Sequence, residues 1–445
     1  MPPGELYKLE KPDGARINRE NISSALDFTK KELRDYIVDS NSPYYYWTDF
    51  KHKKKSYGTL SIEESWTLIR QFRNFSSRHT YLKAKTGEPF VWNESSSLNE
   101  RLHEIDMFMG GKVTSESGDQ RLIVRGIMEE AIASSQLEGA HTTRAAAKKM
   151  ILEGRQPTNR SEQMILNNYK TMSVIEQNYK NEELSLELIF KMHSLLTEGT
   201  MDRSEQGRLR LDVDDIFVHG NIGTKDYTSH VPPDEVFLRR EMDRLIAYAN
   251  DQDGDGFLHP VVKAIFLHFW VGYLHPFVDG NGRLARALFY WYLLKKGYWM
   301  IAYLPISTII RQAPAQYAMA YIQTEQDNLD LTYFFDFHLE KVMSAIKNFN
   351  EYLERKVSEN KNLDLLLSAE MVINDRQRGL LYYLLGDDTA GTTATSHGLL
   401  NNISRQTAAA DLKYLEGAGL VKSKREGQNI RYYASEKLRA YKTQL

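Results

Sequence analysis

Apolar residues recur every three or four positions through most of the chain, as they do on one face of an α-helix. Two of the clearest sets are Ile62, Trp66, Ile69 and Phe72, and Leu122, Val124, Ile127 and Met128. This spacing predicts a mainly α-helical protein.

The helical pattern is interrupted once, between Arg208 and Pro233. An apolar stretch formed by Val213, Ile216, Phe217 and Val218 is followed by Gly220 and Gly223, and then by an extended stretch at residues 227–231. Two such stretches around glycines predict a β-hairpin, and the prolines that follow would end it because proline cannot donate to a strand ladder. A hairpin inside a helical domain either clamps a ligand or packs as an insertion.

The last part of the chain, from about residue 363, has shorter elements. We expect helices at residues 377–385, 399–401 and 405–416, with a loop at residues 391–398 and Ser404 as the N-cap of the last helix. Strands are expected at residues 420–424 and 430–433, joined by a turn at Glu426 and Gly427. Three helices followed by a hairpin predict a winged helix-turn-helix domain.

The chain has 445 residues, which is enough for about three domains. We divide it into an N-terminal helical region of unknown role at residues 1–118, a central domain at residues 119–360 and the winged helix-turn-helix domain at residues 361–445. The first boundary rests on the polar stretch around Ser115 and Gly118.

Composition excludes several classes of protein. With 57 basic and 59 acidic residues the net charge is -2, so no global field attracts nucleic acid or a membrane. The chain has no cysteine, which excludes disulfides, thiolate zinc sites and cysteine nucleophiles. Residues 1–14 lack the apolar core of a signal peptide, and the longest apolar stretch, residues 287–294, is too short for a membrane helix. We predict a soluble, cytoplasmic protein with no membrane partner.

The segment at residues 275–286, HPFVDGNGRLAR, carries the clearest chemistry. Gly280 and Gly282 allow turns that bring backbone amides close to a ligand, and the start of the next helix favours an anion there. Arg283 and Arg286 are three residues apart, so both guanidinium groups can bind the same phosphates. The pattern predicts a phosphate-binding loop.

Two further side chains in this segment suggest chemistry on the phosphates. Asp279 is a hard oxygen ligand that suits magnesium shared with phosphate groups. His275 is the side chain here that can accept a proton near neutral pH.

Residues 275–286 resemble the signature of the Fic family, HPF-x-[D/E]-GN-[G/K]-R-xx-R, at every defined position. The resemblance implies a Fic-type helical bundle with a β-hairpin flap at residues 119–360, and a protein adenylyltransferase that moves AMP from ATP to a hydroxyl of a target protein or of itself. It also implies roles for single residues. His275 would be the general base, Asp279 would hold Mg²⁺, Phe277 would anchor the loop, Gly280, Asn281, Gly282 and Arg283 would form the anion hole, and Arg286 would reach the γ-phosphate.

A second segment, Ser134-xxx-Glu138-Gly139, resembles the family's inhibitory motif [S/T]-xxx-E-[G/N]. The resemblance implies that Glu138 pairs with Arg286 and blocks productive ATP binding. Three alternatives stay open: transfer of another nucleotide or phosphate-containing group, removal of AMP with Glu138 positioning water, and a transcription regulator whose Fic-like domain only senses nucleotide. The hairpin would be the flap that aligns a target segment by strand pairing.

Other signals are weaker. The run Asp251, Asp253, Asp255 and Gly256 imitates a calcium loop, but Val262 stands where the bidentate carboxylate belongs, so we interpret it as an acidic turn. We interpret His259 and His268 as structural residues, and the basic run at residues 51–55 as a solvated loop.

Residues 401–445 carry a local excess of positive charge. The basic residues are Arg405, Lys413, Lys422, Lys424, Arg425, Arg431, Lys437, Arg439 and Lys442, against the acids Asp411, Glu416, Glu426 and Glu436. The residues that open the predicted recognition helix, Arg405, Gln406 and Thr407, can read base edges. DNA binding and protein contacts, including homo-oligomerisation, stay open as alternatives.

Overall fold

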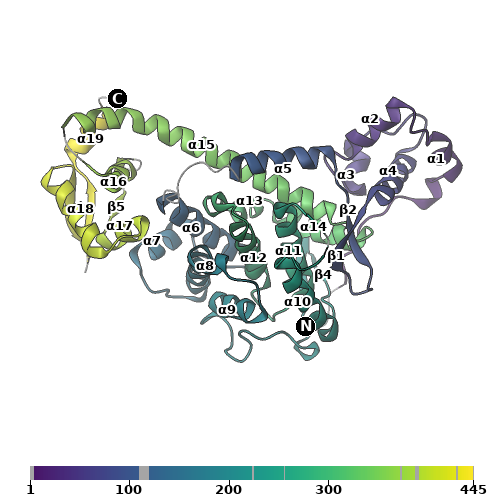
Figure 1. Cartoon of the computed structure of the whole chain (residues 1–445), viewed down its shortest axis with the longest axis horizontal. Helices are drawn as coiled ribbons and strands as arrows, with labels where there is room; N and C mark the ends of the chain where they lie inside the picture. The colour runs from purple at the N-terminus through teal and green to yellow at the C-terminus, as the bar shows by residue number, and fades with distance from the viewer. Residues whose placement is uncertain are drawn as a thin grey trace. The chain divides into compact units, whose positions relative to one another are not determined.

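The computed structural model describes residues 5–109, 120–222, 225–254, 256–370, 373–385, 390–426 and 429–443 (Figure 1). The protein is mainly helical, as predicted, with small antiparallel sheets. It divides into two compact units. The first unit comprises residues 1–111, 174–301 and 309–343, and the second comprises residues 112–173, 302–308 and 344–445. The three functional regions inferred from sequence stay a prediction, and the boundary near Ser115 and Gly118 lies outside the described residues.

The N-terminal part of the first unit is helical, with one hairpin that the sequence analysis did not predict. Its elements are η1 (Gly14–Arg16), α1 (Arg19–Ala25), α2 (Lys31–Ser40), α3 (Trp47–Lys53), α4 (Ile62–Ser76), β1 (Arg78–Lys83), β2 (Pro89–Trp92) and α5 (Ser96–Met109). Helix α4 starts with a capping box in which Ser61 and Glu64 each bond the other's backbone N–H. Trp66 and Ile69 on its inner face are fully buried, as the spacing predicts.

The rest of the first unit surrounds two buried helices. Its elements are η2 (Tyr179–Asn181), α9 (Leu186–Thr197), η3 (Asp212–Asp214), β3 (Val218–Ile222), β4 (Lys225–His230), α10 (Glu235–Ala249), α11 (Pro260–Leu274), α12 (Asn281–Lys295), α14 (Pro314–Gln326) and the first part of α15 (Thr332–Glu370). The short elements η4 (Trp299–Tyr303) and α13 (Ile306–Ile310) connect α12 to α14. Helices α11 and α12 pack against each other and are buried almost all round, because apolar residues occupy nearly every face of α11.

The predicted hairpin is confirmed as β3 and β4, although Val213 lies in η3 before it and Gly223 lies outside the described residues. A third segment joins it. The N–H of Tyr7 donates to the carbonyl of Thr228 at 2.9 Å, and the N–H of Thr228 donates to the carbonyl of Glu5 at 3.1 Å. Residues near the start of the chain therefore cover the outer edge of β4.

The second unit combines three helices from the middle of the chain with the C-terminal part. Its elements are α6 (Gln120–Leu137), α7 (Arg144–Glu153), α8 (Arg160–Gln177, as far as Ser173), the last part of α15, α16 (Asp375–Leu385), β5 (Gly391–Thr392), α17 (Ala394–Asn401), α18 (Arg405–Gly417), β6 (Val421–Glu426), β7 (Asn429–Ala434) and α19 (Glu436–Thr443). The three strands form one sheet in the order β5-β7-β6.

Helix α17 packs against α6 and α7. Leu399 contacts the buried cluster that contains Met128 and Ile132 of α6, and the hydroxyl of Ser396 donates to the carbonyl of Leu152 at 2.9 Å. The C-terminal elements and the inhibitory segment of the sequence analysis therefore belong to one packed body.

The predicted loop at residues 391–398 is wrong. Its first residues pair with β7 as β5, and Thr393 caps α17 by accepting the N–H of Ser396, so most of the remaining residues are helical. The predicted cap at Ser404 is confirmed, since its hydroxyl accepts the N–H of Thr407 at 3.1 Å. Among the described residues, no helix is long and apolar enough to cross a membrane.

Candidate active site

The predicted phosphate loop lies between the ends of α11 and α12. His275 follows the last residue of α11 with a left-handed backbone (φ +47°), which turns the chain out of the helix. Helix α12 begins at Asn281, directly after Gly280. Arg283 and Arg286 are therefore both helical and close to the helix N-terminus, where free backbone N–H groups favour an anion.

Asn281 fixes the shape of the loop. Its side-chain carbonyl accepts the N–H of Phe277 at 2.9 Å, and its side-chain amide donates to the carbonyl of Phe277 at 2.8 Å. Both polar atoms of the side chain are thus used inside the loop. If Asn281 takes part in an anion hole, it does so through its backbone N–H. The ring of Phe277 is fully buried, as expected of an anchor.

His193 of α9 packs against the loop. Its ring stacks on Phe277 with centroids 3.8 Å apart, and its Nε2 lies 2.9 Å from the carbonyl of Asp279. Its Nδ1 accepts the N–H of Gly207 at 3.1 Å, so Nε2 must carry the proton. Burial lowers the pKa of His193 to about 4, which keeps this neutral tautomer in place at physiological pH.

Gly280 is required by both conformation and space. Its φ is +86°, and a Cβ atom would lie 3.0 Å from Cγ2 of Thr197 and 3.3 Å from Nε2 of His193. A larger residue would push the loop away from α9.

The two arginines of the loop are buried. Nη1 of Arg283 donates to the carbonyl of Leu196 at 2.7 Å, and Nη2 lies 3.7 Å from the carboxylate of Asp279. Burial lowers the pKa of His268 and His338, and the charge of Arg286 acts in the same direction on both. Neutral histidines add no second positive charge beside Arg286.

The carbonyls at the end of α11 are paired by side chains from other elements. Arg210 donates through Nε to the carbonyl of His275 at 2.8 Å and through Nη2 to the carbonyl of Leu274 at 3.2 Å. Arg210 also bonds the carbonyl of Pro233, and its own N–H donates to the carbonyl of Pro276 at 2.9 Å. One buried guanidinium thus holds the position from which His275 projects.

His230 at the end of β4 pairs with the next carbonyl. Its Nε2 lies 2.7 Å from the carbonyl of Tyr273, and its Nδ1 lies 2.7 Å from the carboxylate of Glu325. Both partners are acceptors, so the two bonds are satisfied together when each ring nitrogen carries a proton. His230 thus links the end of β4 to the last turn of α11 and to Glu325 of α14.

The half-buried ring of His275 is neutral at physiological pH. Burial lowers the pKa of His275 to about 3, and the charges of His230 and Arg210 act in the same direction. A neutral imidazole keeps a lone pair on one of its two ring nitrogens. This nitrogen can accept a proton from a hydroxyl.

Asp279 is the acidic side chain of the loop at residues 275–286. Its side chain is 42% exposed, and Oδ1 accepts the N–H of Gly280 at 2.6 Å. Among the described residues, no three His, Asp or Glu side chains gather into a metal site. The donor set therefore fits Mg²⁺ only in its common form, in which one carboxylate shares the ion with substrate phosphates and water.

The acidic turn before α11 is structural in the described residues. The ammonium of Lys263 lies 2.8 Å from Asp251 and 2.9 Å from Asp253, so a lysine occupies the place that a cation would take. Asp255 lies outside the described residues. His259 caps α11 and His268 bonds Tyr317, which agrees with their interpretation as structural residues.

The residues of the predicted inhibitory motif lie at the end of α6 in the second unit. Ser134 is buried, while Glu138 follows the last helical residue instead of standing on the helix. Gly139 (φ +86°) donates to the carbonyl of Gln136, and Ala140 donates to that of Ser135. This is a Schellman ending, in which glycine takes the left-handed position. An acid beside a helix C-terminus costs roughly 0.3–1 kcal/mol, so helix stability does not explain Glu138.

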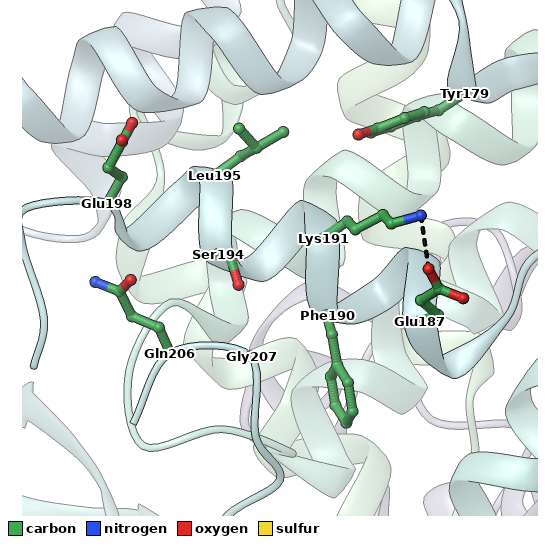
Figure 2. A pocket seen from close by; sticks show the side chains of 9 residues that line it. All are labelled: Tyr179, Glu187, Phe190, Lys191, Ser194, Leu195, Glu198, Gln206 and Gly207. Atoms are coloured by element: carbon green, nitrogen blue, oxygen red, sulfur yellow. Dashed lines mark ion pairs between the residues drawn. The ribbon is translucent and has the colours of Figure 1, made fainter. Parts of the chain in front are cut away.

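A shallow pocket of about 520 Å³ lies on α9 (Figure 2). Its lining includes Glu187, Lys191, Ser194 and Glu198, which share one face of that helix. His193, which holds the loop, lies on the opposite, buried face. The helix face with Glu187, Lys191 and Ser194 is therefore not the one that supports the loop at residues 275–286.

Residues 183–293 match the family model described as the Fic/DOC family. This range contains the whole loop, the helix that supports it and the hairpin. Residues 183–293 are a Fic domain.

Curated relatives carry the same name. "Protein adenylyltransferase Fic" of Nematostella vectensis is 28% identical over 252 residues, which cover 52% of this chain and 55% of that protein. The protein of the same name from Drosophila persimilis is 32% identical over 116 residues, which cover 26% of this chain and 20% of that protein. The chain thus spans between a fifth and about half of these relatives.

Two solved structures match parts of this chain. A Fic family protein from Desulfovibrio desulfuricans G20 has a TM-score of 0.47 and 19% identity, over 78% of this chain and 98% of that one. Fic-1 (residues 134–508) from C. elegans has a TM-score of 0.45 and 16% identity, over 58% of this chain and 74% of that one.

Three residues that shape the Fic domain were not predicted from the sequence, namely His193, Arg210 and His230. Each pairs with a backbone carbonyl far away in sequence, so local pattern carried little signal. The one available hint was a histidine on the apolar face of the helix at residues 186–197.

Replacing Arg210 with alanine should destabilise the first unit by about 3 kcal/mol or more, because each buried carbonyl left without a donor costs about 1–3 kcal/mol. Urea unfolding followed by tryptophan fluorescence measures this, since all six tryptophans lie in the first unit. Arg208→Ala is the matched control. Arg208 pairs with Asp214 at 2.9 Å near the surface, and its loss should cost about 1 kcal/mol or less. Equal losses would contradict the role of Arg210.

His275 should stay neutral well below the usual range of histidine. Because its pKa is about 3, the ring signals of His275 in NMR spectra should not move between pH 8 and pH 5.5. A histidine with a pKa of about 6.5 would be roughly nine-tenths protonated at pH 5.5. The spectrum of His275→Gln assigns the signals, and a titration midpoint near pH 6.5 would disprove the burial argument.

Proposed function

We propose that this protein is an adenylyltransferase that moves AMP from ATP to a hydroxyl side chain of a target protein. The observation that carries the proposal is the loop itself. A neutral histidine, two buried arginines and a helix N-terminus converge on one turn of the chain. Relatives named protein adenylyltransferase Fic support the same reaction.

The reaction needs few steps. The oxygen of the target hydroxyl forms a bond to the α-phosphorus, the bond from that phosphorus to the bridging oxygen of the β-phosphate breaks, and pyrophosphate leaves. The proton of the hydroxyl passes to the free ring nitrogen of His275. Phosphoryl chemistry of this kind depends on positioning and on neutralising charge, which Arg283, Arg286 and the N–H groups of α12 supply.

Asp279 would hold Mg²⁺ together with the phosphates of ATP. The ion supplies charge neutralisation when bound. The chain's own contribution is the placement of the carboxylate, because Asp279 is fixed through its carbonyl by His193 and through Oδ1 by the N–H of Gly280.

The hairpin gives the target a place to bind. In the described part of the chain β3 pairs with β4 alone, while Glu5 and Tyr7 cover the other edge of β4. We therefore propose that an extended target segment pairs with the outer edge of β3. Such pairing reads mainly backbone, so it accepts targets of varied sequence, including a second copy of this chain.

We also propose that Glu138 inhibits the reaction by competing with the γ-phosphate for Arg286. Both acceptors need the same donors of one guanidinium group, so they exclude each other. The unfavourable position of Glu138 beside the C-terminus of α6 supports a role other than helix stability.

His275→Ala should abolish transfer while ATP binding changes little, because the variant lacks the proton acceptor and keeps the phosphate loop. A general base contributes about a hundred-fold to ten-thousand-fold. Transfer of labelled AMP to protein and a parallel ATP titration measure the two properties. His52→Ala, at an exposed position of α3, is the control. Near-normal transfer by His275→Ala would overturn the assignment of the base.

Glu138→Gly should raise self-modification and transfer to added protein by about ten- to a hundred-fold, the range expected when one charged hydrogen bond of roughly 1.5–3 kcal/mol is removed. Glu138→Gln keeps the shape without the charge and should give a smaller gain. Adding His275→Ala should erase both gains.

A loss of transfer in Glu138→Gly would contradict inhibition. Glu138 would then take part in catalysis, and removal of AMP by water would become the better assignment. A screen of labelled nucleoside triphosphates in the Glu138→Gly variant distinguishes transfer of AMP from transfer of another nucleotide.

A further inference from the structure

The C-terminal module, defined as residues 373–385, 390–426 and 429–443, has a surface of basic side chains that nothing in the described chain neutralises. The side chains of five of them are exposed and make no hydrogen bond or ion pair within the described residues: Arg405, Lys413, Lys422, Lys424 and Arg425. Two lie on α18 and three lie on β6.

The acids of the module do not offset this charge. Asp411 is buried, where it pairs with Arg376 at 3.0 Å and with His397 at 3.2 Å. Glu416 accepts the N–H of Ser423, and Glu426 accepts the hydroxyl of Tyr433. These three acids thus help to hold the module together, and none of them forms an ion pair with the five exposed cations.

The shape of this surface suits duplex DNA. Helix α18 has 13 residues, a length of about 20 Å, and Ser404 caps its start. Arg405 and Gln406 are exposed in its first turn, where Gln406 can reach base edges in a major groove and Arg405 can contact the phosphates beside them. All described residues of β6 after Val421 are exposed, so the hairpin projects as a wing.

The packing of α17 restricts how DNA can approach. In Figure 1, α17 lies between α18 and α7, and it is buried against α6 and α7. Arg431 of β7 forms an ion pair with Glu153 of α7 on the same side. The open side of the module is therefore the one that α18 and β6 present.

We propose that α18 and the β6 wing bind duplex DNA, with Arg405 and Lys424 among the phosphate contacts. This inference goes beyond AMP transfer and is independent of it. A protein partner on the same surface is the competing outcome.

Fluorescence anisotropy of the full chain with a labelled duplex of about 30 base pairs, from 50 to 300 mM salt, tests the proposal. Binding should weaken linearly on a log–log plot, and Arg405→Ala with Lys424→Ala should reduce the slope by about two. The control Lys30→Ala with Lys31→Ala removes two exposed charges from the first unit and should leave the slope unchanged.

Absence of salt-dependent binding, or an equal effect of the two double variants, would overturn the proposal. The proposal would also be overturned if the unmodified chain did not bind DNA and the Arg405→Ala, Lys424→Ala variant changed its oligomeric state. That result would assign the surface to protein contacts. Both double variants should transfer AMP as fast as the unmodified protein does. A failure of the DNA-binding proposal can therefore be told apart from a failure of the proposed AMP transfer.

Discussion

The loop at residues 275–286 depends on the pairing of the backbone carbonyls where α11 ends. A buried helix cannot expose its last carbonyls to water, so other side chains must donate to them. Here Arg210 and His230 do so, from the segment before the hairpin and from the last residue of β4. The position of His275 is therefore set jointly by the helix, the hairpin and the segment that precedes it.

Within the loop, the residues divide into those that hold the backbone and those that face a ligand. Asn281 and Phe277 belong to the first group together with His193, since their polar atoms and rings are used inside the fold. His275 and Asp279 keep exposed side-chain surface. A short motif can thus be rigid and still present side chains to a ligand, because some positions fix the backbone and neighbouring positions stay exposed.

Much of the site could be predicted because its chemistry is local. Glycines, a histidine and two arginines within twelve residues indicate phosphate binding without any knowledge of the fold. The supporting residues could not be predicted, because His193 and Arg210 act on carbonyls more than sixty residues away. The fold showed the same division: the periodic helices were predicted well, whereas β5 was missed because Gly391 and Thr392 become a strand only by pairing with β7.

The hairpin beside the active site is also joined to residues near the beginning of the described chain. Glu5 and Tyr7 pair with Thr228, and Gln326 holds the carbonyl of Tyr7 at 2.6 Å. Proteolytic trimming of these few residues would leave an open strand edge on β4, and open edges recruit other strands without regard to sequence. An intact segment at Glu5 and Tyr7 thus limits which strands can pair with the hairpin.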